Sequence, residues 1–398
     1  MTENPWAEPL GIWNLAERHP ELPAVIDSPT GVTLTFGELA GRSHQIVHAL
    51  RSRGIGKDHI VAYALPNGVD MLYWILSLQE SGIHAIALNP ALSVHEIRTV
   101  LEHSGAKALV LHADYADAPE LARTTNVGLK ISVGGDLEGF ESYEAFVEGQ
   151  PLTVPEDRSF GSPISYSSGT TGQPKAIARP NPPGDPTVIA DKSKVFAQAF
   201  QFQPFEGVHL VSAGMHHGGC QGFYLGALTV GQPLVIMGKF DPEGTLERIE
   251  RFKVTTAYMV PTQFVRLLRL SDEIKATYDV SSLEVVVHSA APCPMEVKKA
   301  MFDWWGPVIW ETYGGMEGAA AIAKPKYWLE RPGTVGRAVR GVEIKILDDE
   351  GNELGVGETG NVFIQTQAAF EYRNDPDLTA SVHRGKFFTI GDVGFLDE

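Results

Sequence analysis

The stretch "SSGTTGQPKAIARP", from Ser167 to Pro180, places small, flexible and hydroxyl-bearing residues in front of one lysine. Gly169 and Gly172 allow backbone N–H groups to turn toward a ligand and to approach it closely. Lys175 adds a positive charge, and the side-chain hydroxyls add hydrogen-bond donors. The hydroxyl donors are those of Ser167, Ser168, Thr170 and Thr171. This set of donors suits a polyphosphate.

The spacing of the stretch excludes a Walker A loop. Gly169 and Gly172 are too close together for that motif, and no Ser or Thr follows Lys175. The composition alone is also typical of a polar surface turn. The fixed order of residues behind an apolar strand, "PISYSS" at Pro163–Ser168, is therefore what favours a phosphate site.

Alternating strands and helices are predicted to position this stretch. Apolar runs bounded by turn residues indicate strands, and longer apolar segments that end at glycine indicate helices. Two helix starts carry a capping-box pair, Thr35 with Glu38 and Ser93 with Glu96. The strands expected first are Ile60–Leu65, His84–Asn89 and Ala108–Ala113, separated by helices at Val69–Gly82 and Ser93–Gly105. This order predicts a parallel sheet with helices on its faces.

The middle of the chain repeats this organisation. Its expected strands are His209–Gly214, Pro233–Gly238, Thr255–Val260, Leu283–Ala290 and Pro307–Gly314. Ligands of open α/β sheets bind beyond the carboxyl ends of the strands, where several polar residues lie in this sequence. After Lys324, apolar and polar residues alternate between glycine-rich turns, which predicts antiparallel hairpins in a small β-unit.

Composition limits the class of protein. The chain has 398 residues, which predicts two or three packed units, and a net charge of −17, which argues against nucleic acid or an anionic membrane as a partner. Cys220 and Cys293 form no disulfide framework and no metal-binding spacing. Neither a secretory signal nor an apolar run of membrane-spanning length is present, so we expect a cytoplasmic protein.

Four motifs occur in a fixed order along the chain. They are "YSSGTTGQPK", "ETYGGMEG" at Glu311–Gly318, "GNELGVGETGNVFI" and "FFTIGDVG" at Phe387–Gly394. Together they resemble the signatures of the adenylate-forming superfamily, which includes acyl-CoA synthetases, aryl-CoA ligases, adenylation domains of peptide synthetases and luciferases. The resemblance spans essentially the whole chain.

The resemblance implies the large N-terminal domain of this superfamily. That fold is α/β, with two doubly wound α/β subdomains packed together and a small distorted antiparallel β-barrel. We expect the first subdomain at residues 1–165, the second, with the phosphate loop, at 166–325, and the β-barrel at 326–398. The family continues into a small C-terminal domain that carries a catalytic lysine, whereas this sequence stops at Glu398. We therefore expect ligand binding but little catalysis from the chain as given.

The implied reaction has two halves. A carboxylate attacks the α-phosphate of ATP to form an acyl-adenylate, and a thiol, that of coenzyme A or of a carrier protein, then takes the acyl group. In this resemblance Glu317 binds Mg²⁺ and Asp392 accepts both ribose hydroxyls. The β- and γ-phosphates are held by Ser167, Ser168, Gly169, Thr170, Thr171, Gly172 and Lys175. The adenine is framed by Ala290, Ala291, Pro292, Glu311, Thr312, Tyr313 and Gly314, and Met316 stands beside the α-phosphate.

The acyl site is expected in "SAGMHHGGCQGFYLGAL", Ser212–Leu228, where the family often places an aromatic residue or a histidine. We predict His216 as the gating residue and His217 as its rival. The substrate contacts are expected from His217, Gly218, Gly219 and Gly315. No acidic residue lies between Gly207 and Phe240 to pair with an ammonium, so the substrate is not expected to be an amino acid. Small residues here leave room for a bulky or long hydrophobic acid, or they serve close backbone packing.

The sequence departs from the family pattern at three places. Met316 replaces a threonine whose hydroxyl contacts the α-phosphate, Ile390 replaces the threonine of the last motif, and Ala176 replaces the glycine after Pro-Lys. Loss of one donor to a developing charge can cost about 10²–10³ in rate.

Two hypotheses follow. The first is an acyl-CoA synthetase with impaired adenylation, and the second is a relative that binds acyl-adenylate made by a separate enzyme and transfers the acyl group to coenzyme A. We expect a small carboxylic acid, a nucleotide and CoA as ligands, with a homodimer as one candidate assembly.

Overall fold

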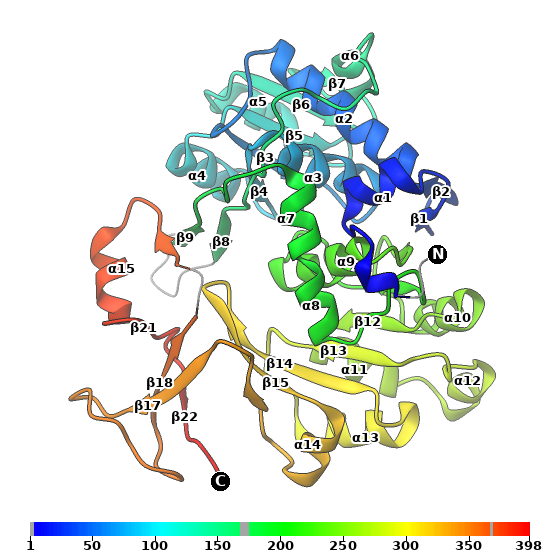
Figure 1. Cartoon of the computed structure of the whole chain (residues 1–398). Coiled ribbons are helices and arrows are strands. Elements are labelled where there is room, and N and C mark those ends of the chain that lie inside the picture. Colours follow the sequence, from blue (N-terminus) through cyan, green and yellow to red (C-terminus); the bar gives the residue numbers. More distant parts are fainter. Residues whose placement is uncertain (1–3, 168–174, 367–368) are drawn as a thin grey trace.

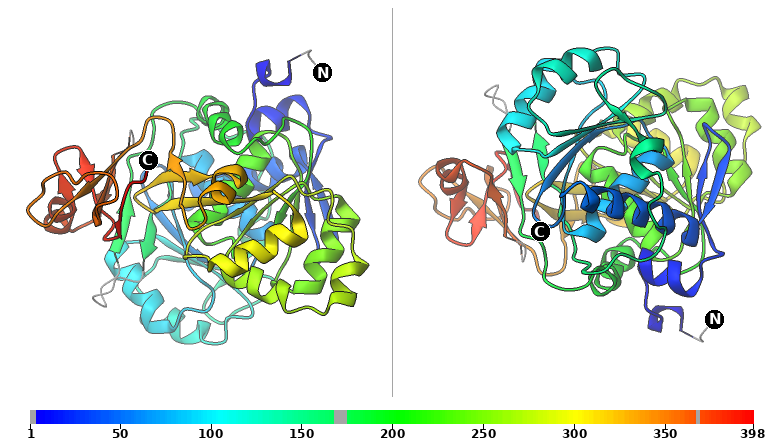
Figure 2. Two further views of the ribbon diagram at one scale, coloured as in Figure 1. Left: turned by 90° about the horizontal axis from the view of Figure 1, so that it is seen from below. Right: turned by 90° about the horizontal axis from the view of Figure 1, so that it is seen from above.

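The computed structural model describes residues 4–167, 175–366 and 369–398. It has the predicted α/β fold, in which two large sheets carry helices on their faces and the C-terminal strands form a separate antiparallel part (Figure 1). Figure 2 shows the same arrangement from below and from above, with the C-terminal strands projecting to one side of the two sheets. The division at residues 165 and 325 remains a prediction.

The first sheet is entirely parallel and has the strand order β4-β3-β5-β6-β7. Its strands are β3 (Ile60–Ala64), β4 (His84–Ala87), β5 (Ala108–His112), β6 (Leu129–Val133) and β7 (Glu141–Ser142). The helices of this part of the chain are α2 (Phe36–Ser52), α3 (Val69–Ser81), α4 (Val94–Ser104), α5 (Ala118–Thr124) and α6 (Tyr143–Val147). The predicted strands and helices of this region are thus confirmed, with strand ends one or two residues shorter.

The second sheet has the order β16-β15-β14-β13-β12-β10-β11-β1-β2. Its strands are β1 (Pro23–Asp27), β2 (Val32–Thr35), β10 (His209–Val211), β11 (Leu234–Ile236), β12 (Thr256–Met259), β13 (Val285–His288), β14 (Ile309–Gly315), β15 (Gly318–Ala323) and β16 (Arg337–Ala338). The neighbouring strands β1, β11, β10, β12, β13 and β14 pair in parallel, whereas β2 is antiparallel to β1. At the other side of the sheet, antiparallel pairing begins at β14–β15, earlier than the expected change after Lys324. β1 and β2 come from the start of the chain but pair with this sheet.

Helices cover both faces of the second sheet. They are α9 (Gly218–Thr229), α10 (Pro242–Phe252), α11 (Pro261–Leu268), α12 (Asp272–Thr277), α13 (Met295–Trp305) and α14 (Pro325–Glu330), with α1 (Ile12–Arg18), α7 (Pro186–Lys192) and α8 (Lys194–Ala199) near the junction of the two sheets. Strand periodicity assigns neighbouring residues to different cores. Val285 and Val287 face the core that the two sheets share, whereas Val286 faces the core under α10, α11 and α13.

Two antiparallel groups complete the fold. One has the order β19-β9-β8, from β8 (Ser165–Ser167), β9 (Lys175–Ala178) and β19 (Glu371–Tyr372). The other contains β17 (Glu343–Leu347), β18 (Gly360–Gln365), β20 (His383–Arg384), β21 (Phe387–Phe388) and β22 (Val393–Gly394), beside α15 (Pro376–Val382). Both groups share a small apolar cluster in which Ile177, Ile364 and Tyr372 are buried. This cluster fixes the C-terminal strands against β9.

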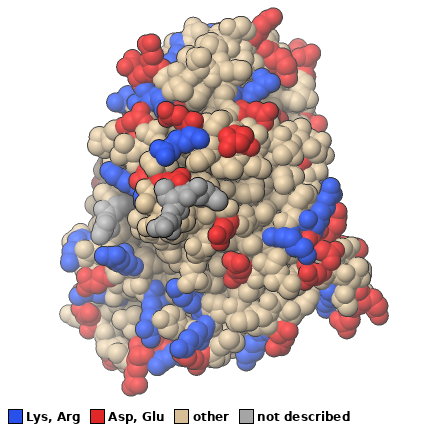
Figure 3. Space-filling model, turned by 45° about the vertical axis from the view of Figure 1, so that its right-hand side comes forward, with Lys and Arg blue, Asp and Glu red and all other residues tan. Residues whose placement is uncertain are grey.

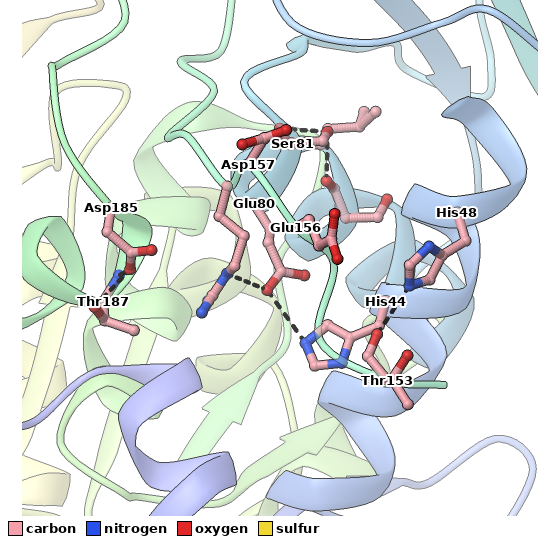
Figure 4. A network of polar contacts seen from close by, with 12 residues as sticks. His44, His48, Glu80, Ser81, Thr153, Glu156, Asp157, Asp185 and Thr187 are labelled. Carbon is pink, nitrogen blue, oxygen red and sulfur yellow. Dashed lines mark hydrogen bonds and ion pairs between the residues drawn. The ribbon is translucent and has the colours of Figure 1, made fainter. Parts of the chain in front are cut away.

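A segment without regular structure, residues 148–164, connects the first sheet to β8. Side chains of α2 bind its carbonyl groups: His48 Nε2 lies 2.9 Å from Thr153 O, and Arg51 donates to Asp157 O at 3.1 Å. Beneath it the fully buried Glu80 carboxylate faces Arg158 Nε at 2.8 Å and His44 Nε2 at 3.2 Å (Figure 4). These are ion pairs by distance, although their angles are not those of hydrogen bonds. A buried charge requires such partners, so this cluster anchors the chain where it enters β8.

Both predicted capping boxes form. Glu38 N donates to Thr35 Oγ1 at 3.2 Å, and Thr35 N donates to Glu38 Oε2 at 2.9 Å. Ser93 and Glu96 make the same reciprocal pair at the start of α4, with distances of 3.4 and 2.8 Å. Each box satisfies two backbone N–H groups that the helix leaves without acceptors.

Replacing Ser93 with alanine is expected to lower the free energy of unfolding by about 1 kcal/mol, because Glu96 N–H loses its acceptor. Denaturant unfolding measures the change. Thr99→Ala is the matched control: Thr99 lies in the same helix, and its hydroxyl donates only to His95 O at 2.8 Å. Alanine has a higher helix propensity than threonine, so Thr99→Ala should lower the free energy of unfolding only slightly. If Ser93→Ala and Thr99→Ala lowered the free energy of unfolding equally, Ser93 would have no capping role.

Within the described ranges, no helix combines the length and apolar character that crossing a membrane requires. Acidic and basic side chains are interspersed over the face that Figure 3 draws, despite the net charge of −17. Cys220 and Cys293 are both free thiols, as the sequence predicted.

Candidate functional site

The candidate residues lie at the carboxyl edge of the second sheet. His216 and His217 follow β10, Ala290 follows β13, and Glu317 lies in the turn between β14 and β15. Because β10, β12, β13 and β14 are parallel neighbours, the segments after them meet at one edge. This is the edge at which open α/β sheets bind ligands.

Glu317 is held by residues from two distant segments. Tyr372 in β19 donates its hydroxyl to Glu317 Oε1 at 2.7 Å. Burial, and then this hydrogen bond to a carboxylate, raise the pKa of Tyr372. Arg179, just after β9, donates to Met316 O at 2.8 Å and to Glu317 O at 2.7 Å, which fixes the backbone of the turn. The carboxylate therefore has a defined position.

Lys175 lies near the tyrosine that binds this carboxylate. It is the first residue of β9, and its Nζ is 6.0 Å from the centre of the Tyr372 ring. Pairing of β9 with β19 produces this arrangement, because Tyr372 is opposite Ile177. Ser167 ends β8 and is the cross-strand partner of Lys175. The predicted phosphate-binding residues Ser168, Gly169, Thr170, Thr171 and Gly172 lie outside the described residues.

Asp392 and Tyr313 are in direct contact. The Tyr313 hydroxyl donates to Asp392 Oδ2 at 2.9 Å. Burial, and then the neighbouring Asp392, raise the pKa of Tyr313. The backbone carbonyl of Asp392 accepts from Val362 N at 2.9 Å, so β18 supports the last motif. The structure thus joins a residue of β14 to one near the C-terminus, as a common nucleotide site requires.

The predicted adenine frame consists of an exposed turn beside β14. Ala290 has a φ of 71°, a strained value for a residue with a side chain, and Ala290, Ala291 and Pro292 are all exposed. Ser289 Oγ donates to Thr312 O at 2.8 Å and ties this turn to β14. Gly314 pairs with Ala319 at the end of the β14–β15 ladder.

Glu311 points to the interior side of this frame. Its Oε2 lies 2.5 Å from Nζ of Lys298, a fully buried lysine whose pKa burial lowers. His288 Nε2 is 3.5 Å from the same oxygen but makes no hydrogen bond with it, and burial lowers the pKa of His288 to about 3. Neither Lys298 nor His288 belongs to a motif, so no sequence pattern connects them with Glu311.

The two predicted gating histidines lie side by side. The ring centres of His216 and His217 are 4.0 Å apart. Burial and then the neighbouring His217 lower the pKa of His216 to about 4, so the imidazole is neutral at pH 7. Its Nε2 is buried and has no hydrogen-bond partner among the described residues. A ring with one free nitrogen in an apolar wall fits a position beside a substrate.

The small residues of this region are close-packed. A Cβ at Gly218 would come within 2.6 Å of Met316 Cε, and one at Gly219 within 2.7 Å of the Tyr258 hydroxyl. A Cβ at Gly315 would collide with Glu317 Oε2 and would lie 3.4 Å from Ile390 Cγ2. These contacts favour close backbone packing over the alternative of open space. They also place Met316 and Ile390, two departures from the family pattern, around the same turn.

Comparison with known proteins gives a consistent result. A family model described as "AMP-binding enzyme" matches residues 12–371. The chain is 28% identical to 4-coumarate–CoA ligase 1 of Arabidopsis thaliana, over 94% of this chain and 70% of the ligase. It is 26% identical to 4-chlorobenzoate–CoA ligase of an Arthrobacter species, over 96% of this chain and 73% of the ligase. Among solved structures, the amide bond synthetase McbA of Marinactinospora thermotolerans superposes with a TM-score of 0.84 at 25% identity, over 98% of this chain and 77% of McbA.

Proposed function

The chain belongs to the family of AMP-binding enzymes, and from this premise we propose that it ligates a hydrophobic carboxylic acid to the thiol of coenzyme A. In the first half-reaction a carboxylate oxygen attacks the α-phosphorus of ATP, and the bond to pyrophosphate breaks. In the second half-reaction the thiol sulfur attacks the acyl carbonyl, and AMP leaves with the electrons of the acyl–oxygen bond.

One observation carries the proposal: Glu317 has a fixed position, and the tyrosine that holds it also lies near Lys175. Tyr372 donates to Glu317 at 2.7 Å and its ring lies 6.0 Å from Lys175 Nζ. A single carboxylate fits a Mg²⁺ ion that takes most of its ligands from substrate phosphates and water. Among the described residues no cluster of three or more acidic, histidine or cysteine side chains could hold a metal by itself. Bound there, Mg²⁺ neutralises charge on the phosphates.

Asp392 is proposed to bind the ribose. Asp392→Ala is expected to weaken the binding of a non-hydrolysable acyl-adenylate at least about tenfold, because two ribose hydroxyls lose their acceptor. Isothermal titration calorimetry measures this loss. Tyr313→Phe serves as the comparison, since it removes only the hydroxyl that donates to Asp392, and it should cost less. Unchanged binding by Asp392→Ala would exclude the ribose role.

The substrate is proposed to be a hydrophobic acid, on three grounds. No acidic residue lies between Gly207 and Phe240. His216, whose pKa burial lowers to about 4, adds no positive charge at neutral pH. The relatives named above act on 4-coumarate and 4-chlorobenzoate, which are aromatic acids. A buried ammonium without a partner would be strongly disfavoured in this region.

Two assays on the full-length protein test the function. ATP–pyrophosphate exchange reports the first half-reaction, and CoA-dependent release of AMP from supplied acyl-adenylate reports the second. The panel contains 4-coumarate, 4-chlorobenzoate, a long-chain fatty acid and phenylalanine. Activity in both assays with an apolar acid supports the proposal. Exchange with phenylalanine alone would overturn the substrate class, and inactivity with every acid in both assays would overturn the function.

Met316 favours a second candidate function, the transfer of an acyl group from acyl-adenylate made by a separate enzyme. The thioether of Met316 is a weak acceptor and no donor, so it cannot stabilise charge that develops on the α-phosphate. The contacts proposed for Asp392 do not depend on it. A protein of this kind would release AMP from acyl-adenylate and CoA without exchanging pyrophosphate. Rapid exchange by the unmodified protein would exclude this candidate.

A further inference from the structure

A pocket of about 490 Å³ lies between the two α/β sheets, apart from the residues discussed above. Its walls come from the ends of β1, β3, β5 and β11 and from the starts of α3 and α10. Segments beyond the carboxyl ends of strands in both sheets thus contribute to it. A volume of this size suits a small molecule, and the carboxyl edge of a sheet is the usual place for one.

The wall on the α3 side carries two acidic groups that have few or no donors among the described residues. Asp27 is 2% exposed, and Thr30 donates to its Oδ2, whereas its buried Oδ1 accepts no hydrogen bond from the described residues. Gly68, which precedes α3, has no capping side chain, and a Cβ there would lie 3.8 Å from Asp27 Oδ1. Asp70, in the first turn of α3, also has no hydrogen bond or ion pair within the described ranges.

The energetics of these two acids favour a positively charged ligand. Burial raises the pKa of Asp27. Burial, and then the charge of Asp27, raise the pKa of Asp70. Two carboxylates that are close to each other and short of donors are costly to keep ionised, and an ammonium group would offset this cost with charge-assisted hydrogen bonds.

The opposite wall carries cationic groups with unused donors. Lys239, after β11, has no polar contact with the described part of the chain. Arg248 in α10 is fixed, because Nε donates to Ser28 Oγ at 2.7 Å, and Nη1 donates to Gly244 O at 2.8 Å and to Glu247 Oε2 at 3.3 Å, whereas Nη2 has no acceptor among the described residues. The third acid of the pocket, Asp241, is engaged as the cap of α10, where its Oδ2 accepts from Gly244 N at 2.7 Å.

The two signs of charge are separated within the pocket. Asp27 and Asp70 lie at the end of β1 and the start of α3, whereas Lys239 and Arg248 lie after β11 and in α10. The pocket therefore presents an acidic end at α3 and a basic end at α10, each with free hydrogen-bonding capacity.

We propose that this pocket binds a small zwitterion, with its ammonium group against Asp27 and Asp70 and its carboxylate against Lys239 and Arg248. The site does not depend on the proposed ligase reaction. It lies beside the segment that leads to His216, because Asn67 in its wall donates to Ala213 O at 2.8 Å and accepts from Met215 N at 2.8 Å. An occupant would contact the residues that support the predicted acyl site.

Isothermal titration calorimetry on the intact chain tests this proposal. The probes are α- and ω-amino acids, each measured beside the amine and the carboxylic acid of the same carbon skeleton. We expect at least one amino acid to bind about tenfold or more tightly than both of its singly charged counterparts. Asp70→Asn and Lys239→Gln should each weaken that binding about tenfold, because each removes one of the charges that meet the ligand.

The matched control is Asp303→Asn, which removes the carboxylate of an exposed residue in α13, outside the pocket wall. It should bind as the unmodified chain does. Asp70 and Lys239 have no partner among the described residues, so their variants should keep the native unfolding temperature. The proposal is overturned if no amino acid binds more tightly than its matched amine and acid, which includes binding of anions alone, or if Asp70→Asn binds the amino acid as tightly as Asp303→Asn does.

Discussion

Glu317→Gln is expected to slow the formation of acyl-CoA by about 10²–10³-fold. The substitution keeps the shape of the side chain and an oxygen that can accept from Tyr372. It removes the charge that would hold Mg²⁺ against the phosphates beside Lys175. Initial rates at saturating ATP measure the effect, and a large excess of Mg²⁺ should recover part of the rate, because a weakened site fills at higher metal concentration.

Two variants separate the charge of Glu317 from its surroundings. Glu371→Gln removes an exposed carboxylate one residue before Tyr372, on the other face of β19, and should leave the rate unchanged. Tyr372→Phe keeps the carboxylate but removes its donor, so we expect a smaller loss than in Glu317→Gln. If Glu317→Gln kept more than half of the rate, Glu317 would have no part in the chemistry.

Met316→Thr is expected to raise the rate of ATP–pyrophosphate exchange about tenfold or more. The side chain of Met316 lies against the start of α9, where a Cβ at Gly218 would come within 2.6 Å of its terminal carbon. Threonine places a hydroxyl donor on this turn, which Arg179 fixes by hydrogen bonds to two backbone carbonyls. A donor in a fixed position can stabilise charge that develops on the α-phosphate. Ile390, which packs near Gly315, limits the gain.

Met316→Val is the matched control, because valine has nearly the shape of threonine and no hydroxyl. Both variants remove the contact with Gly218, so they should have similar unfolding temperatures. Only the threonine variant should exchange pyrophosphate faster. Equal increases of the exchange rate in Met316→Thr and Met316→Val would show that the smaller side chain causes the increase and that the hydroxyl does not. If neither variant exchanges pyrophosphate faster, although the protein releases AMP from acyl-adenylate, a residue other than Met316 limits adenylation.

The sequence predicted the elements of the α/β core well, for a physical reason. Strands such as Ile60–Ala64 and helices such as Val69–Ser81 are buried along their length, so their apolar runs and closing glycines are visible locally. Helix starts were predicted as well, because a capping box is completed within four residues. The prediction missed that β1 and β2 pair with the second sheet, since strand pairing at long range leaves no local pattern.

The sequence by itself determined which chemical groups are available: the stretch around Lys175, the acids Glu317 and Asp392, and the absence of a hydroxyl at Met316. Only the tertiary structure decided which of these groups act together. Tyr372 reaches Glu317 across 55 residues, and Tyr313 reaches Asp392 across 79, because sheet pairing brings distant strands to one edge. The same holds for the pocket at Asp27, whose unsatisfied oxygen exists only because folding buries it between two sheets. Covalent order sets the residue types, but burial and distance set their charge, their partners and hence their chemistry.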